Sequence, residues 1–90
     1  MVDVSSKSNE EMIVNFGALG YNASKMAIII GVEESEIDAL MKDSTSAFSK
    51  LYEKGLGLAE YVIDLKLFEL AKTGDIKALE KLDQRKRQRR

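Results

Sequence analysis

Apolar residues recur every three or four positions through most of this 90-residue chain, and glycines interrupt them at intervals. That spacing is the period of an α-helix with one buried face. The chain has no proline, and Lys, Glu, Leu, Ala and Ile dominate its composition, which also favours helices over strands. We therefore expect one small all-α domain whose helices end at Gly20, Gly31 and Gly74.

A three-helix head should come first. Residues 24–40, SKMAIIIGVEESEIDAL, have the spacing of a helix-turn-helix. Ala27 is the small residue that a close helix crossing needs, and Gly31 stands four residues later in the turn. Ile37 and Leu40 then face inward from the second helix of the motif. These matches predict a homeodomain-like head in which helices cover about residues 9–19, 23–30 and 34–42, the second of them capped by Asn22.

The exposed side of the motif's second helix is acidic, with carboxylates at Glu33, Glu34, Glu36 and Asp38. Carboxylates in a first helical turn complement the helix dipole by about 0.3–1 kcal/mol each, which explains them without any function. They would, however, oppose docking to DNA phosphates, which bind Lys and Arg. Either the motif is a structural or protein-binding unit, or the positive charge that holds DNA comes from elsewhere in the chain.

A long helix over about residues 46–72 follows the head, and its apolar residues form two neighbouring stripes. Gly55 and Gly57 lie inside it and indicate a bend or a close helix crossing. The chain's own helices could cover both stripes, but five short elements can hardly do so, and we favour a subunit interface. The candidate interface residues are Leu58, Tyr61, Val62, Leu65 and Phe68.

The end of the chain is basic, although the net charge is only −1. Residues 83–90 hold one acid and five bases. A last helix, capped by Asp75, should bury Ile76, Leu79 and Leu82 and carry a basic stripe on its other face. The basic tail is either a solvated end that complements the helix dipole or a phosphate-binding arm. The candidate DNA-binding residues are Lys25, Lys42, Lys77, Lys81, Arg85, Lys86, Arg87, Arg89 and Arg90.

The chain lacks the residues that several classes of function require. The chain has no Cys and no His, so thiolate and imidazole chemistry and the usual zinc sites are excluded. No Gly-rich phosphate loop is present, and the acids of the head do not converge, so we expect no enzyme, no cofactor and no metal site. The N-terminus does not have the pattern of a secretory signal, and the longest apolar run is too short for a membrane span. We therefore expect a soluble intracellular protein.

The order of elements resembles the small subunit of a bacteriophage terminase. The resemblance covers about residues 10–90 and lies mainly in the segment FSKLYEKGLGLAEYVIDLKLFELAKTGDIKALEKL that follows the helix-turn-helix. Members of that family show a Phe and a Tyr early in a long helix, then a Gly or Ala, then an apolar run that ends in an LAK-GD–AL phrase. The matching residues here are Phe48, Tyr52, Gly55, Ala59, Leu70, Ala71, Lys72, Gly74, Asp75, Ala78 and Leu79.

The resemblance implies a DNA-recognition and scaffold protein of viral genome packaging, in the cytoplasm of a bacterial host. It implies a homo-oligomer, for which a ring is typical, and as partners double-stranded DNA and a large ATPase/nuclease subunit. The alternatives are a dimeric helix-turn-helix DNA-binding regulator and a protein-interaction module without a DNA role. The expected layout is a flexible arm, a helix-turn-helix head, a helical oligomerisation region and a basic tail, at residues 1–8, 9–44, 45–84 and 85–90.

Overall fold

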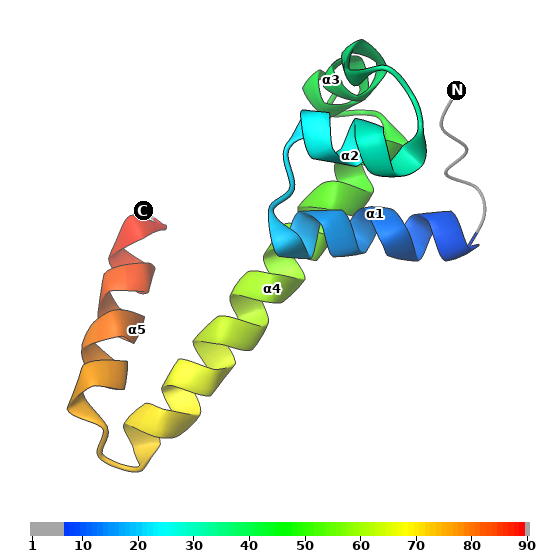
Figure 1. The fold of residues 1–90 in the computed structure, drawn as a ribbon. Helices are drawn as coiled ribbons and strands as arrows, with labels where there is room; N and C mark the ends of the chain where they lie inside the picture. Colours follow the sequence, from blue (N-terminus) through cyan, green and yellow to red (C-terminus); the bar gives the residue numbers. More distant parts are fainter. Residues whose placement is uncertain (1–6, 90) are drawn as a thin grey trace. The chain divides into compact units, whose positions relative to one another are not determined.

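The computed structural model of the protein describes residues 7–89 and is all-helical, with no strand in that range (Figure 1). The expected all-α class is thus confirmed. Five helices follow one another along the chain: α1 (Lys7–Leu19), α2 (Ala23–Ile30), α3 (Glu34–Lys42), α4 (Ala47–Lys72) and α5 (Ile76–Gln88). They form two compact units that divide within α4, one ending at Leu58 and the other beginning at Ala59.

The helix bounds agree closely with the sequence pattern, and two limits differ. Of the expected arm, residues 1–6 lie outside the described part, while Lys7 and Ser8 already belong to α1. At the other end, α5 continues to Gln88, so most of the expected basic tail is helical. Lys, Arg and Gln are good helix formers, so nothing in residues 85–88 stops the helix.

Local side-chain chemistry explains where the helices begin and end. The Asn22 side chain accepts a hydrogen bond from the backbone N–H of Lys25 at 2.9 Å and caps α2. Asp75 accepts from the N–H of Ala78 at 3.0 Å and caps α5 in the same way. Gly31 ends α2 with φ +86°, a left-handed conformation that other residues reach only at a cost.

The first unit has a continuous apolar core. Its fully buried members come from α1, α2, α3 and the start of α4, and are Ile13, Phe16, Met26, Ala27, Ile37 and Phe48. Burying one large apolar side chain of this kind contributes about 1.5–3 kcal/mol. Within this core α2 packs directly against α3. These buried positions fit the apolar period of the sequence, but Leu19, which fits it equally well at the end of α1, is 63% exposed.

Two glycines set the crossing of α1 and α4 in this unit. A Cβ on Gly55 would lie 1.7 Å from the carbonyl oxygen of Val14, and one on Gly17 would lie 1.9 Å from that of Tyr52. The two helix backbones therefore touch, and no side chain fits between them. Gly57 has no atom within 4 Å of a Cβ position. Only Gly55 of the pair thus makes the close crossing that the sequence indicated.

The turn between α3 and α4 is held by Ser46. Its hydroxyl donates to the carbonyl oxygen of Leu40 at 2.7 Å and accepts from the backbone N–H of Ser49 at 3.0 Å. One side chain thus satisfies the end of α3 and the start of α4. Nearby, the side chain and backbone of Thr45 donate to Asp43, and these bonds lower the pKa of the Asp43 carboxyl.

The second unit is a helical hairpin made of the end of α4, a turn with Gly74 at φ +97°, and α5. Ala78 and Leu82 are the buried apolar residues of α5. The expectation that Ile76 and Leu79 are buried was wrong, because these side chains are 68% and 55% exposed. Helix α5 is turned so that Arg85, on the same face as Ala78 and Leu82, meets an acidic residue of α4.

Candidate functional site

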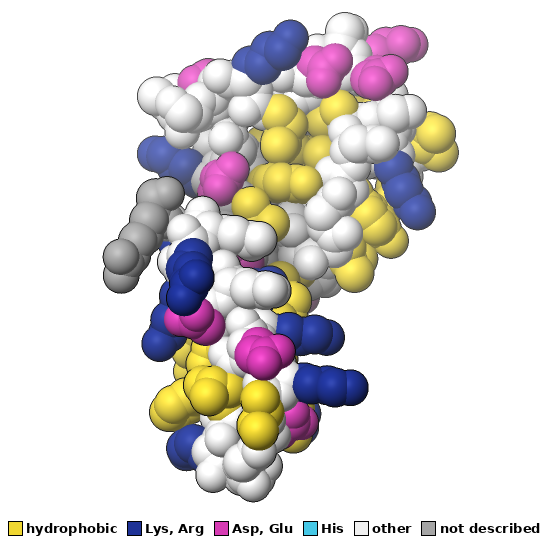
Figure 2. Space-filling view, turned by 90° about the vertical axis from the view of Figure 1, so that its left-hand side faces the viewer, with side chains coloured by type: hydrophobic (Ala, Val, Ile, Leu, Met, Phe, Trp, Pro, Cys, Tyr) yellow, Lys and Arg dark blue, Asp and Glu magenta, His cyan; other side chains and the backbone are white. Residues whose placement is uncertain are grey.

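The apolar face of α4 is the most prominent surface feature of the hairpin. Tyr61, Val62, Leu65 and Phe68 lie on one face of this part of α4, and Leu58, earlier in the same helix, is the last residue of the first unit. All five are exposed, Tyr61 and Val62 at 61% and 62%. Figure 2 shows the side of the hairpin that carries α5, where hydrophobic side chains lie among charged ones in the lower part of the view. The four residues of the hairpin are named here the α4 apolar face; together with Leu58 they are the residues expected to form an interface.

The hairpin has very little core to set against this exposed surface. Ala78 and Leu82 are its only buried side chains among residues 59–89. Units below about 40 residues usually need disulfides, metals or oligomerisation to be stable. The chain has no cysteine, and no cluster of acidic residues in the described part could hold a metal ion. A partner that covers the α4 apolar face would therefore stabilise the hairpin.

A carboxylate and two guanidinium groups meet where α4 and α5 face each other. Arg85 Nε donates to Asp64 Oδ1 at 2.5 Å, and Arg89 Nη2 donates to Asp64 Oδ2. The hydrogen bond from Arg85 is the main reason why the pKa of the Asp64 carboxyl lies below its ordinary value. The Asp64 side chain is only 21% exposed. This cluster, named here the Asp64 clamp, holds two of the candidate DNA-binding residues.

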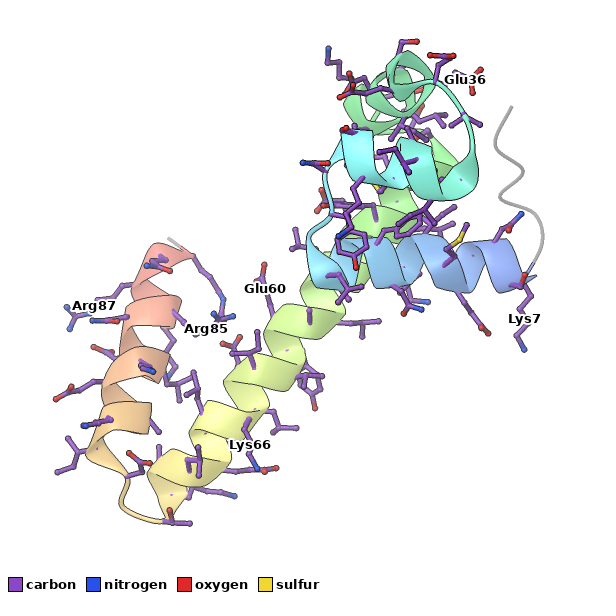
Figure 3. The ribbon with its side chains drawn as sticks, viewed as in Figure 1. Lys7, Glu36, Glu60, Lys66, Arg85 and Arg87 are labelled. Atoms are coloured by element: carbon purple, nitrogen blue, oxygen red, sulfur yellow. The ribbon has the colours of Figure 1, made fainter. Side chains whose placement is uncertain are left out.

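The other bases of α5 are more open. Lys77, Lys81 and Lys86 are exposed and form no ion pair within the described residues. Arg87 pairs with Asp83, one turn earlier, at 2.9 Å, and both side chains are largely exposed. Figure 3 shows Arg87 pointing away from α4. Arg90 lies outside the described residues. The lysines are thus the bases most accessible to a phosphate.

The remaining two candidate bases belong to the head. Lys25 is exposed on α2, with its Nζ 4.4 Å from the centre of the Tyr21 ring, a cation–π contact. Lys42 is the exposed last residue of α3. Both lie in the first unit, whereas the other candidate bases that are described lie in the second.

Three of the four acids that were expected on the exposed side of α3 are exposed. Glu33, Glu34 and Glu36 are exposed around the first turn, and Asp38 is half-buried. Figure 3 shows Glu36 at the outer edge of the head, and Figure 2 shows acidic side chains gathered at that end. None of the four forms an ion pair within residues 7–89. The exposed part of α3 thus presents negative charge to solvent.

Asp64 is the residue of this site that the sequence interpretation missed. It looked like one of several acids on a long helix. A signal was nevertheless present, because Asp64 stands ten residues before Gly74 and Arg85 eleven residues after it. Two helices that run antiparallel from a turn at Gly74 bring such positions level with each other. The Asp64–Arg85 pair can be predicted from the sequence only if the antiparallel hairpin is assumed first.

Comparison of the chain with models of known protein families, with curated proteins and with solved structures finds no match. Within the described residues, no helix combines the length and the hydropathy that crossing a membrane requires.

Proposed function

We propose that the chain is a small DNA-recognition and scaffold protein of viral genome packaging, similar in role to a terminase small subunit. In this proposal α1, α2 and α3 form a helix-turn-helix head, α4 joins copies of the chain, and α5 contacts double-stranded DNA. A large ATPase/nuclease subunit is the partner that the assembly recruits or regulates, in the cytoplasm of a bacterial host. The order of these elements, with their lengths, supports the proposal.

The observation that carries the proposal is the imbalance within the hairpin. Tyr61, Val62, Leu65 and Phe68 are exposed on one face of α4, whereas the buried side chains among residues 59–89 are only Ala78 and Leu82. A second copy of the same chain is a partner that is always present, and apolar side chains spaced three and four apart suit helix-on-helix packing. Self-association then repeats the exposed lysines of α5 around the oligomer and multiplies their attraction for a polyanion.

The acidic α3 fits this division of roles. The start of α3 presents three exposed carboxylates that form no ion pair within the described residues and would repel DNA phosphates. We therefore assign DNA contact to α5 rather than to α3. The head then serves as scaffold or as the surface for a protein partner. This assignment reconciles a helix-turn-helix with an acidic recognition helix.

The experiment that tests the DNA role compares two double variants of the full chain. Lys77→Gln/Lys81→Gln removes two exposed bases of α5, and Lys50→Gln/Lys54→Gln removes two exposed bases, also four residues apart, from α4. We expect the α5 variant to lose close to two units of the slope of log affinity against log salt, because each phosphate contact contributes about 0.9. The α4 variant should keep the wild-type slope. Equal effects, or a wild type that binds no duplex, would contradict the proposal.

The runner-up function, a dimeric DNA-binding regulator, differs in its oligomeric mass. A dimer would read two half-sites about one helical turn, roughly 34 Å, apart. A packaging scaffold should form a larger assembly at the same concentration. The mass of the native oligomer therefore separates the two functions even when both bind DNA.

A further inference from the structure

The Asp64 clamp joins one carboxylate to two arginines of α5 that stand four residues apart. Each oxygen of Asp64 accepts from a different guanidinium group, Oδ1 from Arg85 and Oδ2 from Arg89. The arrangement is partly shielded from water, since the exposed fractions of the side chains are 21%, 29% and 44% for Asp64, Arg85 and Arg89. Such hydrogen bonds between charged groups are the strong ones.

Two guanidinium groups that hold the two oxygens of one anion also suit a phosphodiester. A backbone phosphate offers two non-bridging oxygens, and Arg binds phosphate and carboxylate by the same donor geometry. Beside the clamp, Glu60, Arg85, Gln88 and Arg89 line a hollow of about 260 Å³. Asp64 already takes one donor of each arginine. An anion can therefore bind both guanidinium groups with these donors only after it displaces the Asp64 carboxylate.

We propose that Arg85 and Arg89 form a site for a nucleic-acid backbone phosphate, and that Asp64 occupies this site in the free protein as an internal competitor. The inference rests on the proposed DNA role of α5 and adds a masked site to it. A DNA phosphate must displace the Asp64 carboxylate before the arginines can bind it. The free chain then binds DNA mainly through Lys77, Lys81 and Lys86, which have no such competitor.

The test removes one negative charge in two different places. Asp64→Asn keeps the side-chain shape but no longer holds the arginines by charge. Glu60→Gln removes the same charge from the same hollow, one turn earlier on α4, without touching an ion pair (Figure 3 labels Glu60). The probe is a random-sequence 30-base-pair DNA duplex, titrated at several salt concentrations against the full chain. Circular dichroism and sedimentation are measured for each variant.

Asp64→Asn should bind the duplex at least about fivefold more tightly at 0.1 M salt and with a steeper salt slope, because each freed arginine adds about 0.9 to the slope. Glu60→Gln should change affinity by less than about twofold. The triple variant Asp64→Asn/Arg85→Gln/Arg89→Gln should return to the affinity of the wild type or fall below it. Equal gains for Asp64→Asn and Glu60→Gln would overturn the proposal, since net charge alone would then explain them.

A second comparison needs no change at Asp64 and therefore no assumption about the folding of that variant. Arg89→Gln and Lys81→Gln each remove one positive charge from α5 of the wild type. If Arg89 is masked, its loss should change affinity by less than about twofold, whereas Lys81→Gln should weaken binding by up to about tenfold at 0.1 M salt. Equal losses would overturn the masked site.

The outcomes for the two proposals are distinguishable. A wild type that binds DNA, together with Asp64→Asn that binds no more tightly, overturns the masked site and leaves the DNA role intact. A wild type without binding overturns the DNA role as proposed. If Asp64→Asn then binds where the wild type does not, the masked site is upheld. If neither binds, both proposals fail.

Discussion

At the scale of single residues, the contact between α1 and α4 depends on Gly55. Gly55→Ala places a Cβ 1.7 Å from the Val14 carbonyl oxygen, so the two helices must move apart. Overpacking of this kind costs about 1–3 kcal/mol. Each kcal/mol lowers the melting temperature by about 4–8 °C in a domain of this size. Thermal unfolding followed by circular dichroism measures the change.

Gly57→Ala is the matched control for that variant. It lies two residues later in the same helix, where the added Cβ meets nothing within 4 Å. Replacing an unconstrained helical glycine by alanine stabilises by about 0.5–1 kcal/mol. The two variants should therefore shift the melting temperature in opposite directions. A destabilised Gly57→Ala with a harmless Gly55→Ala would mean that the crossing point is wrongly placed.

Variants of α2, α3 and the turn between them can be ranked by melting temperature in the same way. Ala27 is 4% exposed within the core, whereas Ala39 is exposed on α3. Ala27→Leu should cost about 1–3 kcal/mol by overpacking, and Ala39→Leu should be nearly silent. Gly31→Ala should cost about 1–2 kcal/mol because its φ is +86°. Three melting curves check the order, and the reverse order of the two alanine variants would contradict the proposed helix-turn-helix.

At the scale of elements, the Asp64 clamp makes the joining of α4 and α5 dependent on pH. The hydrogen bond from Arg85 holds the pKa of the Asp64 carboxyl below its ordinary value of 3.8. A carboxyl whose pKa is lower in the folded state adds stability that is complete above the unfolded pKa and is lost as the pH falls through the folded pKa. By protonating Asp64, acid should therefore weaken the hairpin, whereas the buried core of the head consists of apolar side chains that do not titrate.

The measurement compares melting temperatures of the wild type and Asp64→Asn across pH. The wild type should be the more stable at about pH 6, and the difference should shrink once the pH falls below the ordinary value of 3.8. Glu60→Gln serves as control, because Glu60 forms no ion pair within the described residues. A difference that persists unchanged at about pH 2 would show that Asp64 does not act through its charge.

The elements also show what a sequence can and cannot predict. Asn22, Gly31 and Asp75 were placed correctly because caps and left-handed turns depend on neighbours within four residues. The orientation of α5 was not predicted correctly, because Ile76 and Leu79 fit an apolar stripe as well as Ala78 and Leu82 do. The choice between the two faces depends on Asp64, which is distant in sequence. The same limit applies to Gly17, whose role depends on Tyr52.

At the scale of the whole molecule, the α4 apolar face is exposed and no other described residue of the chain buries it. The described residues of the second unit expose apolar side chains along α4 and also at Ile76 and Leu79 of α5. Burying a large apolar side chain contributes about 1.5–3 kcal/mol, so a partner that covers several of these side chains would stabilise the hairpin. Lys72, whose Nζ lies 5.0 Å from the centre of the Phe68 ring, covers only a small part of the surface.

A charge on the α4 apolar face should separate the copies without unfolding them. Leu65→Glu/Phe68→Glu places two carboxylates on side chains that are already exposed in the single chain. Within an interface they would be buried without partners, which costs several kcal/mol. The variant should therefore sediment as a smaller particle of unchanged helical content. The matched control is Glu69→Gln, on the same helix but outside the face.

Sedimentation equilibrium of the wild-type chain at tens of micromolar tests the central claim most directly. A single chain has a mass of 10.1 kDa. If copies of the chain cover the α4 apolar face, the measured mass is a multiple of that value, larger than two for a packaging scaffold, and Leu65→Glu/Phe68→Glu lowers it. A wild type that sediments at 10.1 kDa under these conditions would contradict the account.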